Sequence, residues 1–143
     1  SDTGLYKETD SHKKTADLKA RCQLINDTAP ALTISIHQNS YSDAGISGAQ
    51  VFYYSTSEKS RLLAEQLQEK LISMVDPTNH RAAKANDSYY MLRKTVSPTV
   101  IVECGFLSNE KECKKLQEEK YQDKIVEAIY QGIVTFAQMQ ESN

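Results

Sequence analysis

The most informative part of the chain is Thr99-Val100-Ile101-Val102-Glu103-Cys104-Gly105-Phe106-Leu107-Ser108-Asn109. Its first four residues are β-branched, which suits a strand buried on both faces. Gly105 then permits a tight turn. Asn109 with Glu112 three residues later is a capping-box pattern, which predicts the start of a helix. The stretch therefore predicts a strand, a turn and a helix in succession, with Glu103 where the apolar run stops.

A second segment has the same design and places a histidine at the corresponding point. Residues 32–36 (Leu-Thr-Ile-Ser-Ile) alternate like a strand, and His37 follows. Ligands of open α/β sheets bind beyond the carboxyl ends of the strands. If the two strands are parallel neighbours, His37 and Glu103 meet at one edge of the sheet. An imidazole beside a carboxylate there indicates metal or acid–base chemistry. Taken alone, Glu103 is better explained as a carboxylate that caps the following turn or pairs with a Lys or Arg.

The rest of the chain alternates between helical and strand patterns. Apolar residues at helical spacing predict a helix over residues 15–27, and residues 49–54 read as a strand. Ser55 with Glu58 is expected to cap a helix over about residues 57–74. The buried stripe of that helix is expected to contain Leu63, Leu67, Leu71 and Met74.

The second half continues the alternation. Residues 76–78 (Asp-Pro-Thr) are expected to end the long helix, and residues 89–92 (Tyr-Tyr-Met-Leu) are interpreted as a short strand or turn. After the helix at Asn109, a longer helix is expected to carry the apolar stripe Tyr121, Ile125, Ile129, Ile133 and Phe136. These elements predict one α/β domain over residues 1–143, with a mostly parallel (mixed) sheet and helices on both faces.

Composition limits the classes of function. The chain has 143 residues, 39% hydrophobic and 25% charged, with a net charge of −2, which is ordinary for one globular domain. This charge gives no reason to expect a nucleic-acid partner, and no apolar run is long enough to cross a bilayer. The three cysteines form no CxxC pair, so a disulfide framework and a cysteine zinc site are not expected.

Two motifs resemble those of the zinc-dependent N-acetylmuramoyl-L-alanine amidases of the amidase-3 family. Residues 35–40 (Ser-Ile-His-Gln-Asn-Ser) resemble the family's SIHAN motif, and residues 102–109 resemble its VE-x-GFLSN motif. Residues 17–21 and 48–54 add to a resemblance that runs to about Phe136. These stretches are most similar to the compact spore-cortex amidases that act in germination.

The resemblance implies a peptidoglycan hydrolase that cleaves the amide between N-acetylmuramic acid and L-alanine of the stem peptide. It implies Zn²⁺ as cofactor, His37 as one metal ligand and Glu103 as the catalytic general acid–base. Asn39 and Ser40, in the polar loop after His37, are expected at the substrate-binding rim. It also implies an extracytoplasmic location, in the cell wall or spore cortex, with peptidoglycan as partner and a possible regulatory protein.

The family's glycine-rich turn with a zinc-binding His, and a later zinc-binding Glu, have no counterpart in this chain. We therefore expect an N-terminally truncated domain portion, which lacks two of three zinc ligands and is inactive alone. His12, in a predicted loop over residues 1–14, and His80 are interpreted as solvated histidines without a metal role.

Three alternatives remain at this point. Cys104 and His37 could form a thiol-based hydrolase, but strand alternation turns Cys104 away from a cleft that Glu103 faces. A non-catalytic wall-binding or regulatory relative of the amidases would have the same motifs. A cytosolic α/β binding module could match them by chance, in which case His37 and Glu103 would lie far apart.

Overall fold

A computed structural model describes residues 13–141 of the chain. The helices are α1 (Lys13–Thr28), α2 (Glu58–Lys70), α3 (Tyr90–Lys94), α4 (Glu110–Leu116) and α5 (Glu119–Glu141). The strands are β1 (Thr33–Asn39), β2 (Gln50–Tyr53), β3 (Lys84–Ala85) and β4 (Thr99–Phe106). A π-helical turn, η1 (Leu71–Val75), continues α2. Most of the predicted loop, including His12, lies outside the described residues, and Lys13 and Lys14 already belong to α1.

The four strands form one mixed sheet in the order β1-β4-β2-β3. β1 runs parallel to β4, β3 runs parallel to β2, and β2 runs antiparallel to β4. All eight residues of β4 are buried, as its β-branched sequence predicts for an inner strand. The parallel pairing of β1 with β4 confirms the arrangement expected from the two motif-bearing segments.

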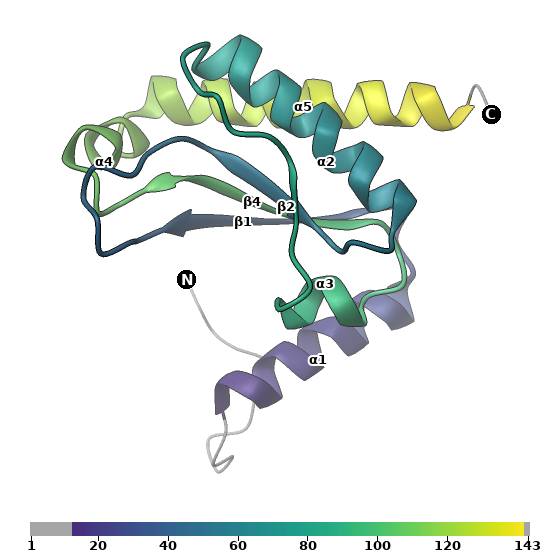
Figure 1. The fold of residues 1–143 in the computed structure, drawn as a ribbon. Coiled ribbons are helices and arrows are strands. Elements are labelled where there is room, and N and C mark those ends of the chain that lie inside the picture. Colours follow the sequence, from purple (N-terminus) through teal and green to yellow (C-terminus); the bar gives the residue numbers. More distant parts are fainter. Residues whose placement is uncertain (1–12, 142–143) are drawn as a thin grey trace.

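Helices cover both faces of the sheet, which confirms the expected α/β architecture. In Figure 1, α2 and α5 lie on one face, α1 and α3 lie on the other, and α4 follows the carboxyl end of β4. Successive side chains of a strand point to opposite faces. Val100, Val102 and Cys104 accordingly join the apolar core beneath α2 and α5. Ile101 and Glu103 face α1 and α3 instead, which leaves Glu103 outside that core.

The predicted stripe of α2 is buried, apart from its last member. Leu63, Leu67 and Leu71 are at most 1% exposed, whereas Met74 is 37% exposed. Including Met74 was wrong, because η1 widens the helix there and breaks the regular 3.6-residue spacing of the stripe. The stripe of α5 packs on the same core through Ile125, Ile129 and Phe136, with Tyr121 and Ile133 partly buried beside it.

Two local predictions, the cap of α2 and the structure of residues 89–92, are wrong because side-chain hydrogen bonds override the local sequence pattern. The cap of α2 is Ser57, whose hydroxyl accepts the N–H of Ser60 at 3.2 Å. Ser55 instead donates its hydroxyl to Asp87 at 2.6 Å. Residues 90–94 form the helix α3, with Tyr89 as its N-cap residue, where a short strand or turn was predicted. The side chain of Asn86 accepts the N–H groups of Ser88 and Tyr89, which supports the chain just before this helix.

Asn109 caps α4 as predicted, since its side chain accepts the N–H of Glu112 at 3.0 Å. The second half of the expected capping box does not form. The Glu112 carboxylate instead accepts the N–H of Phe106 at 2.7 Å and of Gly48 at 2.9 Å. Glu112 is only 8% exposed. It therefore ties the chain entering β2 to the end of β4, close to the edge where His37 and Glu103 lie.

Candidate functional site

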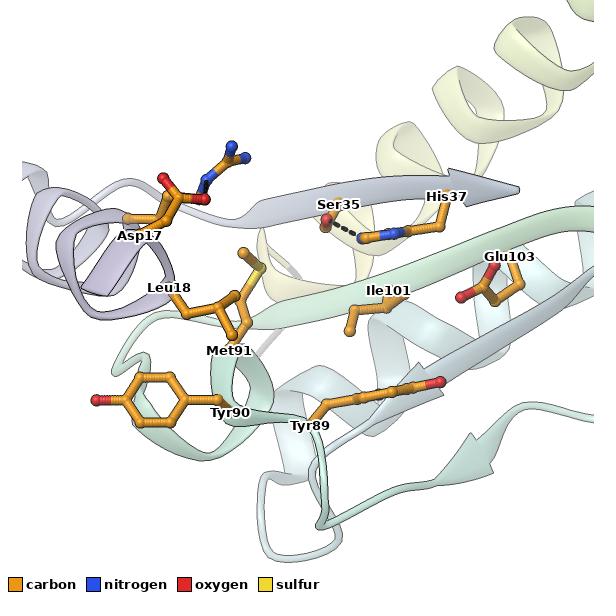
Figure 2. Close-up of a pocket in the computed structure, with 10 residues that line it drawn as sticks. Asp17, Leu18, Ser35, His37, Tyr89, Tyr90, Met91, Ile101 and Glu103 are labelled. Atoms are coloured by element: carbon orange, nitrogen blue, oxygen red, sulfur yellow. Dashed lines mark hydrogen bonds and ion pairs between the residues drawn. The ribbon is translucent and has the colours of Figure 1, made fainter. Parts of the chain in front are cut away.

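His37 and Glu103 are brought together at the carboxyl ends of adjacent parallel strands. They are register partners in the pairing of β1 with β4, so their side chains leave the same face of the sheet. Both line a cavity of about 350 Å³ between that face and the helices α1 and α3 (Figure 2). The adjacency expected from the sequence is therefore confirmed, and the reading as an unrelated module with chance motifs fails.

The cavity is lined by strand residues on the side of the sheet and by both polar and apolar residues on the side of α1 and α3. Ser35, Ile101, His37 and Glu103 come from the strands, and Tyr89 precedes α3. The full lining consists of Asp17, Leu18, Arg21, Ser35, His37, Tyr89, Tyr90, Met91, Ile101 and Glu103. Such a mainly apolar hollow with a few convergent polar groups is typical of a small-molecule or substrate site.

Glu103 has the electrostatic character of a proton-transfer group. It is 7% exposed, and its Oε2 atom is buried without a hydrogen-bond partner. Burial raises the pKa of the Glu103 carboxyl, and the nearby His37 lowers it by a smaller amount. A buried acidic oxygen without a partner is costly in a purely structural role. A raised pKa brings a glutamate closer to neutral pH, where it can both accept and return a proton.

His37 is more exposed than Glu103 and is held by its neighbour along the strand. The Nε2 atom of His37 lies 2.8 Å from the Ser35 hydroxyl, within hydrogen-bonding distance. A hydrogen bond at one ring nitrogen fixes the orientation of an imidazole and leaves the other nitrogen to a ligand. Ser35 is therefore a contact of His37 that the alternating strand pattern alone could not identify.

A catalytic zinc site needs about three protein ligands. Within residues 13–141, no group of three or more His, Cys, Asp or Glu side chains is arranged to hold a metal ion. His37 and the unpartnered Glu103 oxygen fit one ligand and one acid–base group. They do not make a complete site by themselves.

Asn39 and Ser40 lie just beyond this cavity. Asn39 is the last residue of β1, and its side chain accepts the N–H of Ser40 at 2.8 Å. The Asn39 carbonyl accepts the N–H of Leu107 at 2.7 Å, so the loop after β1 is fastened to the turn after β4. Neither side chain is among the residues that line the cavity. Their role in binding substrate stays a prediction.

Cys104 faces the opposite side of β4 from Glu103. It is 5% exposed within the apolar core, and burial, together with the charge of Glu103, raises the pKa of its thiol to about 11. A nucleophilic cysteine needs a lowered pKa and access to substrate. The structure therefore removes the thiol-based alternative. His80 is exposed and does not line the cavity, as expected for a solvated histidine.

The sequence analysis missed the helical wall of the cavity. Asp17 and Arg21 form an ion pair of 2.9 Å across one turn of α1, a spacing that the sequence displays. Nothing in that spacing shows which face of the sheet the helix covers. Tyr89, which the sequence analysis placed only in a short strand or turn, is half-buried and lines the cavity.

Comparison with known proteins agrees with this geometry. The model of the amidase-3 family, described as N-acetylmuramoyl-L-alanine amidase, matches residues 2–135. The germination-specific N-acetylmuramoyl-L-alanine amidase of Bacillus subtilis is 37% identical over 139 residues, which are 95% of this chain and 58% of that protein. The chain thus spans little more than half of this curated relative.

Solved structures show the same relationship. The CwlD amidase from Clostridioides difficile, solved in complex with the GerS lipoprotein, is 41% identical and superposes with a TM-score of 0.92. That match covers 97% of this chain and 73% of the other. An N-acetylmuramoyl-L-alanine amidase from Clostridium difficile 630 is 30% identical with a TM-score of 0.79, over 85% of this chain and 65% of the other. The chain belongs to the amidase-3 family of N-acetylmuramoyl-L-alanine amidases.

Proposed function

We propose that the protein containing this chain hydrolyses the amide between N-acetylmuramic acid and L-alanine in peptidoglycan. The observation that carries the proposal is the pairing of His37 with Glu103 at one sheet edge, in a chain of this family. An imidazole ligand beside a buried, unpartnered carboxylate is what hydrolysis of an unreactive amide by activated water requires.

The proposed roles follow from the environments of the two groups. Glu103 accepts a proton from the attacking water as the new C–O bond forms, and then delivers it to the nitrogen as the C–N bond breaks. Its raised pKa suits both steps. The imidazole of His37, oriented by Ser35, provides one ligand for Zn²⁺. When bound, this ion would polarise the carbonyl and acidify water.

The substrate surface, location and partners belong to the same proposal. In this proposal Asn39 and Ser40 contact the substrate at the rim of the cavity, and the hydrogen bonds that join the loop after β1 to the turn after β4 support it. Peptidoglycan as substrate implies extracytoplasmic action, on the cell wall or the spore cortex. The relative from B. subtilis is named germination-specific, which supports the cortex. Among the described residues, no helix is long and apolar enough to span a membrane. The CwlD complex with GerS supports a protein partner.

The test uses the protein with its complete native sequence, loaded with zinc, and purified peptidoglycan. We expect free stem peptides with L-alanine at their amino terminus, and loss of release when a chelator is added. Glu103→Gln is expected to lower the rate by about 10²–10⁴-fold, the usual contribution of a general acid–base. Glu110→Gln is a matched control, because Glu110 is an exposed glutamate on α4.

The alternative, that the protein is a non-catalytic relative of the amidases, predicts a different result. A wall-binding or regulatory protein would sediment with peptidoglycan and release no peptide, and Glu103→Gln would leave its binding unchanged. Peptide release by wild type that persists in Glu103→Gln at the same rate would contradict the role assigned to Glu103.

A further inference from the structure

The cavity contains one hydroxyl that the proposed chemistry does not yet use. Tyr89 lies at the amino end of α3 and lines the cavity together with His37 and Glu103. Figure 2 shows its phenol end directed toward Glu103, whereas the phenol end of the adjacent Tyr90 points to the opposite end of the cavity. The two tyrosines are therefore adjacent in sequence, but only the hydroxyl of Tyr89 is directed toward Glu103.

The ring of Tyr89 is held in place by packing. It contacts Phe52 of β2 edge-on, with ring centroids 5.9 Å apart and planes at 85°. The backbone of Tyr89 is fixed as well, because its N–H donates to the side chain of Asn86 and its carbonyl accepts the N–H of Arg93. Because both the ring and the backbone of Tyr89 are held, its hydroxyl has a defined position. Little conformational entropy is then lost when the hydroxyl binds a substrate.

The hydroxyl of Tyr89 is a neutral donor at physiological pH. Burial raises the pKa of the phenol, and the charge of Glu103 raises it further. The hydroxyl does not satisfy the buried Oε2 atom of Glu103, which has no partner. The Tyr89 hydroxyl keeps its proton, and the Glu103 carboxylate can accept one. The two groups thus face the same cavity without a hydrogen bond between them.

We propose that Tyr89 is a further catalytic residue, which donates a hydrogen bond to the carbonyl oxygen of the scissile amide while Glu103 handles the proton of water. This inference rests on the proposed amidase function. Attack of water moves an electron pair onto the carbonyl oxygen, and a fixed donor that meets this developing charge stabilises the transition state more than the ground state. The phenol keeps its proton throughout, so no additional reactant is required.

The alternative is that Tyr89 only packs against Phe52. Tyr89→Phe separates the two roles, because it retains the ring and its contact with Phe52 and removes only the hydroxyl. Tyr130→Phe is the matched control, since Tyr130 is 57% exposed on α5, which covers the face of the sheet opposite the cavity. A packing role predicts unchanged kinetics in both variants.

The experiment measures kcat and KM for a soluble N-acetylmuramoyl-peptide with the complete native protein. We expect Tyr89→Phe to lower kcat by about ten- to a hundredfold with little change in KM, as for the loss of one oxyanion donor of moderate strength. Tyr130→Phe should retain wild-type kcat. Thermal unfolding of both variants should match wild type, which excludes a change in folding as the cause.

Three results would overturn the inference, and they have different meanings. An active wild type with equal kcat in Tyr89→Phe removes the role of Tyr89 and leaves the amidase function standing. An equal loss in Tyr130→Phe shows that the effect is not specific to the hydroxyl facing Glu103. A wild type that cleaves no muramyl-peptide contradicts the proposed function and this inference together.

Discussion

The carboxylate of Glu112 accepts the backbone N–H of Gly48 across 64 residues of sequence, at 2.9 and 3.1 Å from its two oxygens. The same carboxylate accepts the N–H of Phe106. Gly48 has a φ of +101°, and a Cβ atom there would lie 2.9 Å from the side chain of Asn79. One buried acidic residue thus fixes both the entry to β2 and the end of the strand that carries Glu103.

Glu112→Ala is expected to lower the free energy of unfolding by about 2–4 kcal/mol, because two buried N–H groups lose their acceptor. Urea unfolding at pH 7 measures this change. Glu110→Ala provides the control, since that exposed glutamate lies on the same helical turn and should cost only a few tenths of a kcal/mol. Equal stability of the Glu112→Ala variant and wild type would show that water replaces the carboxylate at no cost.

The burial of Glu103 predicts a pH dependence of stability in protein kept free of metal by a chelator. Because burial raises the pKa of Glu103 above its ordinary value of 4.5, the folded state binds this proton more tightly than the unfolded chain. The free energy of unfolding therefore falls as pH rises from about 4.5 to the raised value, and this contribution is constant above it.

Glu103→Gln cannot titrate and removes this contribution. The stability of the variant relative to wild type should increase between pH 4 and pH 7, as measured by urea unfolding at each pH. A substitution that stabilises the protein and lowers its activity is the pattern expected of a residue kept for function rather than for folding. A relative stability that does not change with pH would show that Glu103 has the same pKa in both states.

The environment of the cysteines predicts the order of their reaction with iodoacetamide. Cys104 and Cys22 are buried and the pKa of each thiol is raised, whereas Cys113 is only half-buried. With a pKa of about 11, less than roughly one in a thousand Cys104 thiols is ionised at pH 7.5. Mass spectrometry of the native protein should find Cys113 labelled first. Early labelling of Cys104 would contradict its position in the core.

The sequence predicted the parts of the fold that depend on local pattern. The β-branched run of β4, the apolar stripe of α5 and the Asn109 cap are each visible within a few residues. The pairing of His37 with Glu103 required only that two such strands be parallel neighbours.

The parts that the sequence could not predict depend on distant partners. Ser55 and Ser57 are equivalent as caps until Asp87 takes the hydroxyl of Ser55. Glu112 satisfies the capping-box pattern, yet Gly48 and Phe106 compete successfully for its carboxylate. An aromatic residue such as Tyr89 could equally belong to the core. Only the placement of α3 against the sheet directs its side chain toward Glu103. The wall of the site was therefore the least predictable part.

The close approach of α2 and α5 at Gly132 supports the last prediction. A Cβ atom on Gly132 would lie 2.6 Å from Cδ2 of Leu67 and 3.1 Å from its Cα. Leu67 is fully buried, so its side chain has little room to move. Gly132→Ala gains about 1 kcal/mol of helix propensity but overpacks the core at a cost of about 1–3 kcal/mol.

We expect Gly132→Ala to destabilise the protein by roughly 1 kcal/mol net, as the difference between these two effects. The control is Ala137→Gly at an exposed position of α5, which measures the propensity contribution alone. Adding the destabilisation of Ala137→Gly to that of Gly132→Ala cancels the propensity contribution and isolates the packing cost at Leu67. If Gly132→Ala instead stabilises the protein by the full propensity value, the helices can separate freely, and the tight contact that holds α5 over the core would not be required.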